Sequence, residues 1–520
     1  MNAHPNLSRP IRSLLRLIPI VTASFLGLLA QPPVVAGEAS EARLPTIDPD
    51  YCGVTIPPNI APLDFRIQEP GLSFEIRIAG AAGTPVEIFS RKPQVVVPIK
   101  PWRALLEANR GQPITIQVAA MRETGELDRF AVITNFVAPE PIDGFLVYRR
   151  LNWQFTRYAN GSIGIYQRNL ADFQETELVR IKERNADNRG TCVNCHTFLK
   201  NQPDVMALHA RVGTTGEKPM IIANKGNITT VAKPFGLLAW HPSGHLLAFS
   251  QNLFSMILHS VGRNRDVYDG AGDIGIYTLA SETVTMPPKI SLPDRFETWP
   301  TWSPDGKYLY FCSGPKLPVQ QYQEIKYDLM RIAFDEASGA WGDVEEVLSS
   351  KTTGLSIAEP RISPDGNHLL FCMFPYSSFP GTQPESDLYM MDLRTKKYQR
   401  LDAVNSNRSE CWHSWSSNGR WFVFSSKRRD GLLTRPYFSY FDSQGQAHKP
   451  FLLPQKDPAD FYDSLPQMIN LPELVTGPVP YGQRTWFKAM FAPEHRVVPK
   501  QSGETSDAPA SMGEPGSPMN

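Results

Sequence analysis

The segment Trp302-Ser303-Pro304-Asp305-Gly306 runs almost directly into the apolar segment Tyr308-Leu309-Tyr310-Phe311. Serine, aspartate and glycine favour turns, whereas the aromatic and aliphatic residues on either side favour strands. The two segments together therefore predict a β-hairpin, with a strand, a tight turn at Gly306 and a second strand.

This hairpin occurs four times in the second half of the chain. The other copies turn at Ser243-Gly244, Asp365-Gly366 and Asn418-Gly419, so that successive turn glycines are separated by 62, 60 and 53 residues. A further strand-forming segment follows each hairpin, at 275–277, 329–332, 388–391 and 437–440. Recurring four-stranded units are typical of β-propeller blades. With two less regular units around 163–166 and 220–222, we predict about six blades.

The region before these repeats has a different pattern. Apolar and polar residues alternate over 72–78 and 114–118, which predicts strands, and one helix with Pro101 in its first turn interrupts them. We therefore predict an all-β protein in which a β-sandwich precedes the propeller. The expected parts are a signal peptide (1–36), a linker (37–60), the β-sandwich (61–151), a region with a cysteine motif and the first propeller strands (152–235), the main propeller (236–493) and a disordered tail (494–520).

Composition excludes several classes of protein. The 520 residues include 52 Lys+Arg and 52 Asp+Glu, and this zero net charge argues against nucleic-acid binding. A hydrophobic content of 41% excludes general disorder, and 47 prolines with 36 glycines favour a turn-rich β protein. Six cysteines are too few for a disulfide scaffold, so each has to be interpreted by its position.

The N-terminus has the pattern of a targeting segment. Arg9, Arg12 and Arg16 precede a mostly apolar stretch over 17–30, and 34–36 is the best cleavage site. The apolar stretch is too short to span a bilayer, and no later stretch is long enough. We expect a periplasmic or secreted protein with no transmembrane segment after cleavage, the alternative being an uncleaved interfacial anchor.

Residues 192–196, Cys192-Val193-Asn194-Cys195-His196, match the C-x-x-C-H signature of c-type haem attachment. On one helical turn the two thiols can add to the haem vinyl groups, and the adjacent imidazole can reach the iron as proximal ligand. The sequence thus predicts one covalent haem c, held by Cys192 and Cys195 with His196 on the iron, in a short helical insertion. A zinc site or redox dithiol is the alternative, but no second C-x-x-C or C-x-x-H pair and no βαβ pattern accompanies the motif.

The sixth iron ligand is less defined. Residues 202–212 are predicted to form a short helix, because Pro203 suits its first turn and Gly213 follows its end. Met206 and His209 would share one face of this helix, so either is a candidate ligand. His241, which replaces the serine of the other repeats, is a weaker candidate. A five-coordinate iron with an open site is the remaining alternative.

The other cysteines have no pattern of their own. Cys312 and Cys372 occupy equivalent repeat positions, which diverge between neighbouring blades, so we expect buried thiols there and at Cys411 rather than a disulfide. Cys52 lies in the predicted linker and has no assignment. His413, at the start of the fourth hairpin, is expected to face the channel mouth, where propellers bind partners.

The repeats at 302–306 and 362–366 resemble the Tol-type propeller repeats of TolB. A longer pattern is similar to a group of exported bacterial TolB-like proteins that carry one C-x-x-C-H; it includes 164–170, 206–209, 240–244, 413–416 and 471–479. The resemblance covers roughly residues 64–479, and it implies fold, compartment and haem rather than a particular reaction. His241 and Asn418 depart from the usual Ser and Asp of the repeats.

Three functions are consistent with these features. The first is a periplasmic monohaem electron-transfer protein whose propeller face docks a periplasmic redox partner or envelope protein. The second is a non-enzymatic TolB-like interaction scaffold with a structural haem or none. The third, a haem enzyme or sensor, requires an open distal site. No conventional catalytic constellation supports an enzyme, and a propeller by itself is neutral as to function.

Overall fold

The computed structural model describes residues 43–152, 162–182, 192–211, 220–231, 236–259, 265–492 and 498–499. All of them belong to one compact unit, Arg43–Asn520. Strands dominate this unit, as the all-β prediction required. The predicted signal peptide lies outside the described residues. Within the predicted disordered tail (494–520), residues 498–499 pair as a short strand with residues 283–284, so the prediction was wrong there, and the rest of the tail lies outside the described residues. Within the described residues, no helix is both long enough and apolar enough to cross a membrane.

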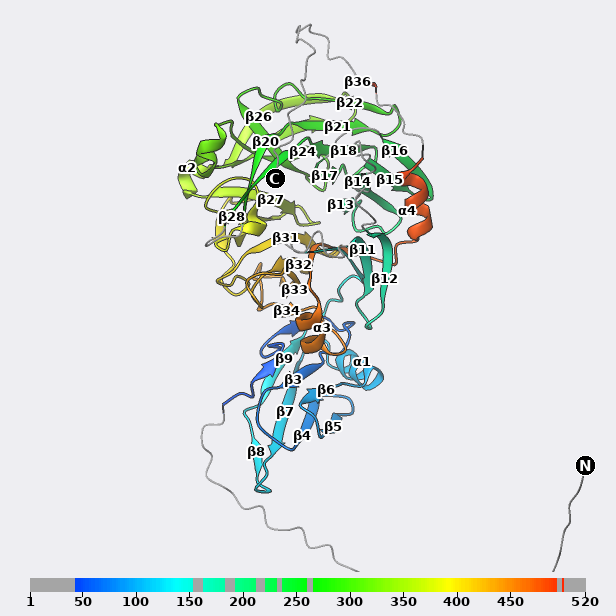
Figure 1. Cartoon of the computed structure of the whole chain (residues 1–520), viewed down its shortest axis with the longest axis vertical. Coiled ribbons are helices and arrows are strands. Elements are labelled where there is room, and N and C mark those ends of the chain that lie inside the picture. The colour runs from blue at the N-terminus through cyan, green and yellow to red at the C-terminus, as the bar shows by residue number, and fades with distance from the viewer. Residues whose placement is uncertain are drawn as a thin grey trace, which may run out of the picture. The chain divides into compact units, whose positions relative to one another are not determined.

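Six sheets of four or five strands make up most of the fold (Figure 1). In sheet order they are β35 (Gln467–Val475), β10 (Phe145–Asn152), β11 (Ser162–Asn169) and β12 (Glu175–Lys182); β13 (Cys192–Phe198), β14 (Val205–Arg211), β15 (Met220–Asn224) and β16 (Asn227–Val231); β17 (Leu238–Trp240), β18 (Leu246–Ser250), β21 (Ile274–Thr278), β22 (Thr283–Thr285) and β36 (Val498–Pro499); β23 (Arg295–Trp302), β24 (Tyr308–Pro315), β25 (Asp328–Asp335) and β26 (Ala340–Leu348); β27 (Ser356–Ile362), β28 (His368–Phe374), β29 (Asp387–Asp392) and β30 (Tyr398–Arg400); and β31 (Glu410–Trp415), β32 (Trp421–Ser426), β33 (Arg435–Tyr440) and β34 (Phe451–Leu452).

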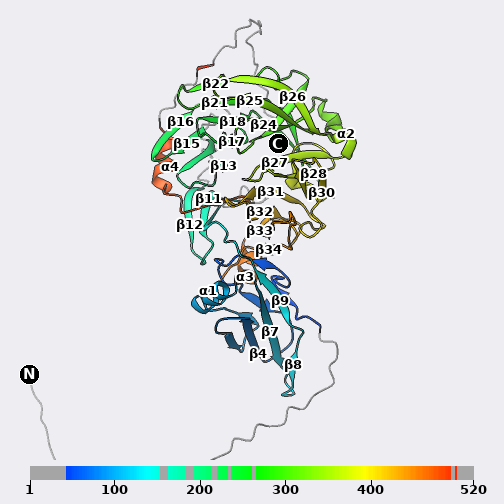
Figure 2. The same ribbon diagram turned by 180° about the vertical axis from the view of Figure 1, so that it is seen from behind.

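The first strands of these sheets contact one another in a closed order. β13 contacts β17, β17 contacts β23, β23 contacts β27, β27 contacts β31, β31 contacts β35, and β35 contacts β13. Figures 1 and 2 show the sheets arranged around a common centre, with the labelled strands β13, β17, β27 and β31 toward the inside. The arrangement is β-propeller-like. The sheet of β35 is unusual because it joins a late strand to three early ones, with Arg149 of β10 paired to Asn470 of β35.

The four predicted hairpins are confirmed. They are β17–β18, β23–β24, β27–β28 and β31–β32, and each turn glycine has a positive φ, between 65° and 78°. Side chains complete the turns, as where the Ser303 hydroxyl donates to Asp305 at 2.6 Å and accepts from the backbone N–H of Tyr308 at 3.0 Å. The predicted third strands of these units are also present, as β21, β25, β29 and β33.

The N-terminal part contains two further sheets and one helix. One sheet has the order β2-β9-β7-β4-β5, with β8 also paired to β7, and the other has the order β1-β3-β6. Their bounds are β1 (Ile47–Asp48), β2 (Thr55–Ile56), β3 (Phe65–Ile67), β4 (Ser73–Gly80), β5 (Val86–Ser90), β6 (Gln94–Val95), β7 (Pro113–Met121), β8 (Leu127–Arg129) and β9 (Ile133–Val137). The predicted helix is α1 (Ile99–Ala108), which buries Trp102, Leu105 and Leu106 against the N-terminal core.

The limits of the N-terminal part differ from the predicted ones. β1 and β2 lie inside the predicted linker, because their short strands pair with β3 and β9 respectively. β10, placed by sequence at the end of the N-terminal domain, pairs with β35 and β11 and so belongs to the ring of six sheets.

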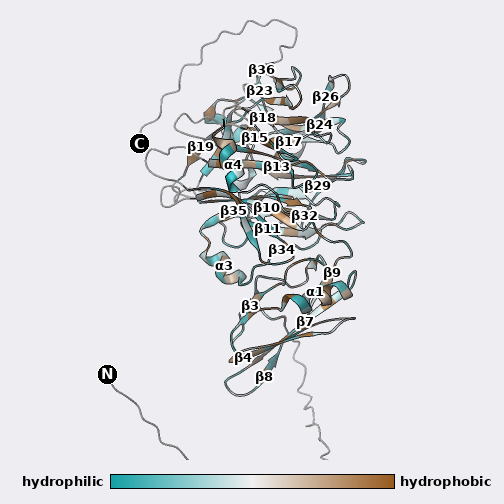
Figure 3. Ribbon diagram, turned by 90° about the vertical axis from the view of Figure 1, so that its right-hand side faces the viewer, coloured by the Kyte–Doolittle hydropathy of each residue, from teal (hydrophilic) through white to brown (hydrophobic). Residues whose placement is uncertain are grey.

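The remaining elements lie between or after the ring strands. They are the two-stranded sheet β19 (Leu253–Leu258) and β20 (Arg265–Ala271), the short helices η2 (Val319–Glu324), α2 (Ser350–Thr353) and η3 (Pro380–Thr382), and the helices α3 (Pro458–Ser464) and α4 (Gln483–Met490). Hydrophobic and hydrophilic residues are interspersed along the strands in Figure 3. The second strand β18 is buried along its whole length, whereas the outer strand β26 is at least partly exposed at every position but its last, which places the main core between the inner parts of the sheets.

Candidate functional site

The cysteine motif lies on strand β13, the innermost strand of its sheet. The predicted helical insertion was therefore wrong. Val193, Thr197 and Phe198 are strand-forming residues, and they pair with β14 instead of starting a helix. The pairing is interrupted between Asn194 and Thr197, where Cys195 has a φ of 42°. Such an irregularity is a β-bulge, and bulges commonly redirect side chains near functional sites.

The same bulge recurs in four other inner strands. Trp299, Glu359, Trp412 and Leu471 also have positive φ values, between 51° and 56°, and the strand register shifts at each of them. The residues that follow are Pro300, Pro360, His413 and Pro472. Cys195 and His196 therefore occupy in β13 the same structural position that these residue pairs occupy in the other inner strands. Aligning Cys-His-Thr-Phe with Trp-Pro-Thr-Trp at 299–302 would have revealed this from sequence.

His196 is buried at the centre of the ring, with 2% of its surface exposed. Among the described residues, neither ring nitrogen makes a hydrogen bond of acceptable geometry, although the backbone of Val147 and Leu471 lies near. Burial, reinforced by the charge of Arg149, lowers the pKa of His196 to about 3. The imidazole is therefore neutral at physiological pH, and a neutral imidazole has a lone pair for a metal.

His196 lies between a polar network and a small cavity. Arg149 donates to the side-chain oxygens of Asn194 and Asn470, the latter at 3.1 Å. A cavity of about 20 Å³ beside His196 is lined by residues of all six inner strands, including Trp299, Trp412 and the charged Arg361. This space holds a water molecule and no more.

The donor set fits a c-type haem, and the enclosed space fits it less well. The Cys195 thiol is half-buried, and among the described residues neither nitrogen of the adjacent imidazole has a hydrogen-bond partner. The side chain of Cys192 lies outside the described residues. So do the segments 183–191 and 212–219, which continue the chain from β13 and β14. A haem bonded here would require the residues around the 20 Å³ cavity to move apart.

The helix predicted over 202–212 was also wrong, because these residues form a turn and then strand β14. Residues three apart on a strand point to opposite faces, so the shared face of Met206 and His209 does not exist. Met206 is buried in an apolar cluster with Val193 and Trp486. His209 is paired in register with Asn194 and is also buried. Their roles as distal ligands remain untested predictions.

His241 has another structural role, which makes it a poor iron ligand. Its Nε2 lies 3.1 Å from the carbonyl oxygen of Gly306, and its Nδ1 lies 2.7 Å from the hydroxyl of Ser243. Its ring also packs edge-on against Trp302, at a centroid distance of 4.7 Å. Both nitrogens are therefore engaged, Nδ1 within the β17–β18 turn and Nε2 in joining this turn to the next hairpin.

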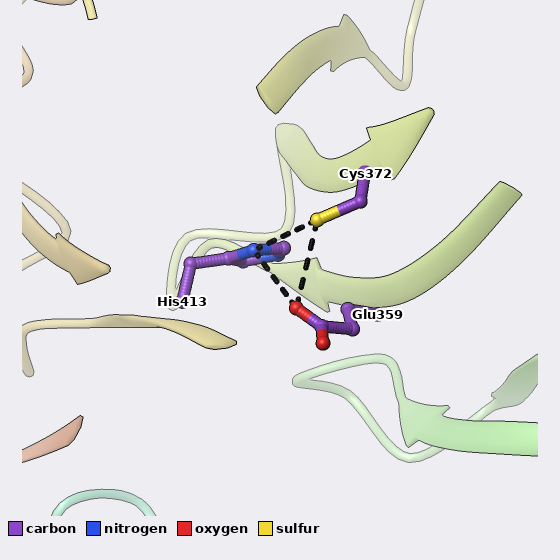
Figure 4. A group of neighbouring side chains, drawn as sticks. All are labelled: Glu359, Cys372 and His413. Carbon is purple, nitrogen blue, oxygen red and sulfur yellow. Dashed lines mark hydrogen bonds and ion pairs between the residues drawn. The ribbon is translucent and has the colours of Figure 1, made fainter. Parts of the chain in front are cut away.

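A second group of potential ligands was missed by sequence reasoning. Glu359, Cys372 and His413 come from β27, β28 and β31, and all three are buried (Figure 4). His413 had been expected at the channel mouth and Cys372 as a plain buried thiol. Their approach depends on how adjacent sheets pack, and spacing in the sequence carries no signal for it.

A larger cavity of about 440 Å³ lies along the ring axis on the other side of the bulges. Residues of all six inner strands line it, including Trp240, Trp302 and Trp415, and the charged lining residues are Lys200, Arg361 and Glu473. Its tryptophans and its polar and charged lining residues could give a ligand both apolar and hydrogen-bonding contacts.

Comparison with known proteins shows no family model and no curated protein that matches this chain. Several solved structures are weakly similar. A putative 6-phosphogluconolactonase from Bacteroides uniformis is 11% identical over 74% of this chain and 97% of its own, with a TM-score of 0.31. Prolyl oligopeptidase B from Galerina marginata is 11% identical over 59% of this chain and 44% of its own, with a TM-score of 0.32. The GH74 xyloglucanase from Xanthomonas campestris is 12% identical over 60% of this chain and 46% of its own, with a TM-score of 0.32. Values this low say nothing about the activity of this chain.

Proposed function

We propose that this protein is an exported, monohaem c-type cytochrome that transfers electrons in the periplasm. Cys192 and Cys195 would hold the haem through thioether bonds, and His196 would be the proximal ligand. The haem supplies a one-electron redox centre, and the propeller would dock the redox partner or envelope protein.

The observation that carries this proposal is the state of His196. Burying a polar group without a hydrogen bond costs about 1–3 kcal/mol, so native structures rarely keep such a group without a reason. Both nitrogens of this imidazole are buried and unengaged among the described residues. A metal bond would satisfy one of them, and the neighbouring thiol of Cys195 is the second element of the attachment signature.

We further propose that the six ring sheets are the six blades of a TolB-like propeller and that the N-terminal sheets form a sandwich. Support comes from the closed order of contacts between inner strands and from the sheet in which β35 joins β10–β12. In such a ring the late strand would close the circle by supplying the innermost strand of the first blade.

Haem attachment is tested with a pyridine haemochrome spectrum of mature protein made in cells that contain haem-maturation machinery. We expect a c-type α-band in the wild type and its loss in Cys192→Ala/Cys195→Ala. A variant in which Cys312→Ser replaces a buried cysteine outside the motif should keep the band. A folded wild-type protein without covalent haem would refute the cytochrome proposal.

The stability of His196 variants gives a second test that needs no redox partner. In haem-free protein, His196→Leu should raise the free energy of unfolding by about 1–3 kcal/mol, because it removes an unsatisfied buried polar group. In haem-loaded protein the same change should lower stability and alter the haem absorption spectrum, because an iron ligand is lost. Chemical denaturation of both forms measures the difference. A loss of stability in the haem-free form would contradict the interpretation of His196 as a buried polar group without a partner in the absence of haem.

The interaction scaffold remains the second candidate, supported by the 440 Å³ axial cavity and its three tryptophans. This function would not need His196 or either motif cysteine. Partner capture that is equal in wild type and in Cys192→Ala/Cys195→Ala would favour it.

A further inference from the structure

Three potential metal ligands meet between two adjacent sheets of the ring. The Sγ of Cys372 lies 3.5 Å from Oε2 of Glu359 and 3.9 Å from Nδ1 of His413, and the last two atoms are 3.8 Å apart. The three residues are at most 4% exposed. Figure 4 shows the three side chains pointing toward one another from separate strands.

The repeated bulges place two of these side chains. Glu359 is the positive-φ residue of β27, and His413 directly follows the positive-φ residue Trp412 of β31. The backbone N–H of Trp412 donates to Oε2 of Glu359, which fixes this carboxylate against the neighbouring sheet. The irregular backbone therefore positions the ligand atoms before any ion binds, and such pre-organisation favours binding.

Hydrogen bonding sets the histidine tautomer. Nε2 of His413 lies 3.0 Å from the carbonyl oxygen of Leu370. Because a carbonyl only accepts, Nε2 carries the proton and Nδ1 keeps its lone pair, which faces Cys372 and Glu359. A backbone carbonyl in this position is a typical outer partner of a metal-bound imidazole.

One oxygen of the group is buried without a hydrogen bond. Oε1 of Glu359 has no partner among the described residues, while Oε2 accepts from Trp412. If the carboxylate served only to bind the neighbouring strand, this oxygen would be left buried without a hydrogen bond, which costs about 1–3 kcal/mol. A cation bound through Oε2 would neutralise the buried carboxylate as a whole and so lower the cost of keeping it in the core.

The spacing of the three atoms matches a transition metal. The point equidistant from Sγ, Nδ1 and Oε2 lies about 2.2 Å from each, close to the ~2.0–2.3 Å bonds of zinc. A tetrahedral zinc ion would separate such ligand atoms by roughly 3.3–3.6 Å, so shifts of a few tenths of an ångström would complete the geometry. A cavity of about 10 Å³ beside Glu359 and His413 has room for one water molecule as a fourth ligand.

We propose that Glu359, Cys372 and His413 form a binding site for one divalent transition-metal ion, with Zn²⁺ as the best match. Thiolate, imidazole and carboxylate are the three ligand types that zinc uses in proteins. A thiolate and a carboxylate together neutralise a divalent ion, so the buried complex has no net charge of its own. The site is separate from the proposed haem, although Trp412 and Leu471 line the cavities next to both His196 and His413.

Cobalt binding tests this proposal, because a thiolate bound to Co²⁺ gives a charge-transfer absorption band. The full mature chain is used in a Cys192→Ala/Cys195→Ala background, so that the haem motif cannot bind the metal and the result does not depend on the proposed function. We expect one Co²⁺ per chain, the charge-transfer band, its displacement by Zn²⁺ and a rise in melting temperature.

Cys372→Ser should abolish the charge-transfer band and weaken Co²⁺ binding by at least about tenfold, since loss of an outer partner alone costs that much. Serine suits this position, because Ser250 and Ser425 hold the corresponding places in other sheets. Glu359→Gln, which keeps an acceptor for the Trp412 N–H, should also weaken binding.

Cys312→Ser is the matched control. Cys312 occupies the corresponding position of the preceding sheet, paired with Thr298 and Leu329 as Cys372 is paired with Ala358 and Leu388. The positions next to Cys312 that correspond to Glu359 and His413 are occupied by Trp299 and Pro360, which are not metal ligands. The Cys312→Ser variant should therefore bind Co²⁺ like its parent. Absence of metal binding by folded parent protein, or equal binding by Cys372→Ser, would overturn the proposal.

Discussion

Replacing Trp421 with alanine is expected to lower the free energy of unfolding by about 3–5 kcal/mol. Trp421 begins β32 and is completely buried. Its ring packs against Tyr440 and Phe451, at centroid distances of 5.0 and 6.4 Å. Its Nε1–H donates to the backbone carbonyl of Glu140 at 3.2 Å, which joins the sheet to the segment that precedes β10. Truncation would therefore leave both a cavity and an unpaired carbonyl.

Chemical denaturation measures this loss, and two variants resolve its origin. Trp421→Phe keeps most of the ring volume but removes the donor, so it should cost less than the alanine variant. Trp341→Ala removes a half-buried tryptophan on the outer strand β26, and it should cost less still. Equal losses in the free energy of unfolding for Trp421→Ala and Trp341→Ala would show that the complete burial of Trp421 is not the source of its contribution to stability.

The hairpins could be predicted because their information is local. Each turn needs a glycine with positive φ and a serine or aspartate to hold it, and both lie within five residues of one another. The order of the sheets around the ring then follows from chain order. Closure by β35 could not be predicted this way, because its partner β10 is more than 300 residues away and has no turn or spacing that marks it.

The secondary structure of the cysteine motif was predicted incorrectly for a specific reason. The C-x-x-C-H motif was predicted to lie in a helix, because such motifs usually do. However, Val193, Thr197 and Phe198 favour strands. Tertiary pairing with β14 then decided the structure. The same error carried over to Met206 and His209, whose proposed shared face required a helix.

The cluster of Glu359, Cys372 and His413 illustrates what sequence could not supply. Two of its members are 13 residues apart within one hairpin, and the third lies on the next sheet. The bulges of β27 and β31 direct the side chains of Glu359 and His413 toward Cys372 of β28. These bulges recur at corresponding positions, so a structural alignment of the repeats would find the group, whereas ligand spacing would not.

Raising the pH from 5 to 8 is expected to destabilise the protein through Glu297, which is 1% exposed. Its Oε1 accepts a hydrogen bond from Ser313 at 3.3 Å, while its Oε2 has no partner among the described residues. Burial, together with the nearby charge of Asp273, raises the pKa of Glu297 to about 8, against about 4.3 in an unfolded chain. The folded state therefore holds this proton more tightly than the unfolded state.

The sign of the effect follows from that difference. Below about pH 4 Glu297 is protonated in both states and its burial costs little. As the pH rises toward 8 the unfolded state ionises first, so the stability is lost progressively, up to at most roughly 5 kcal/mol at 1.4 kcal/mol per pKa unit. Burial also raises the pKa values of Asp64, Glu359 and Glu473 to about 7, so these groups add losses of the same sign.

Glu297→Gln isolates the contribution of this one carboxyl. At pH 5 the variant and the wild type should have similar unfolding free energies, because glutamine resembles the protonated acid. At pH 8 the variant should be the more stable by about 2–4 kcal/mol, since it has no buried charge to form. Glu75→Gln changes an exposed glutamate of β4 and should leave the pH dependence as it is. Parallel pH profiles for wild type and Glu297→Gln would mean that this carboxylate remains ionised in the fold, with a cation or water supplying the partner that Oε2 lacks.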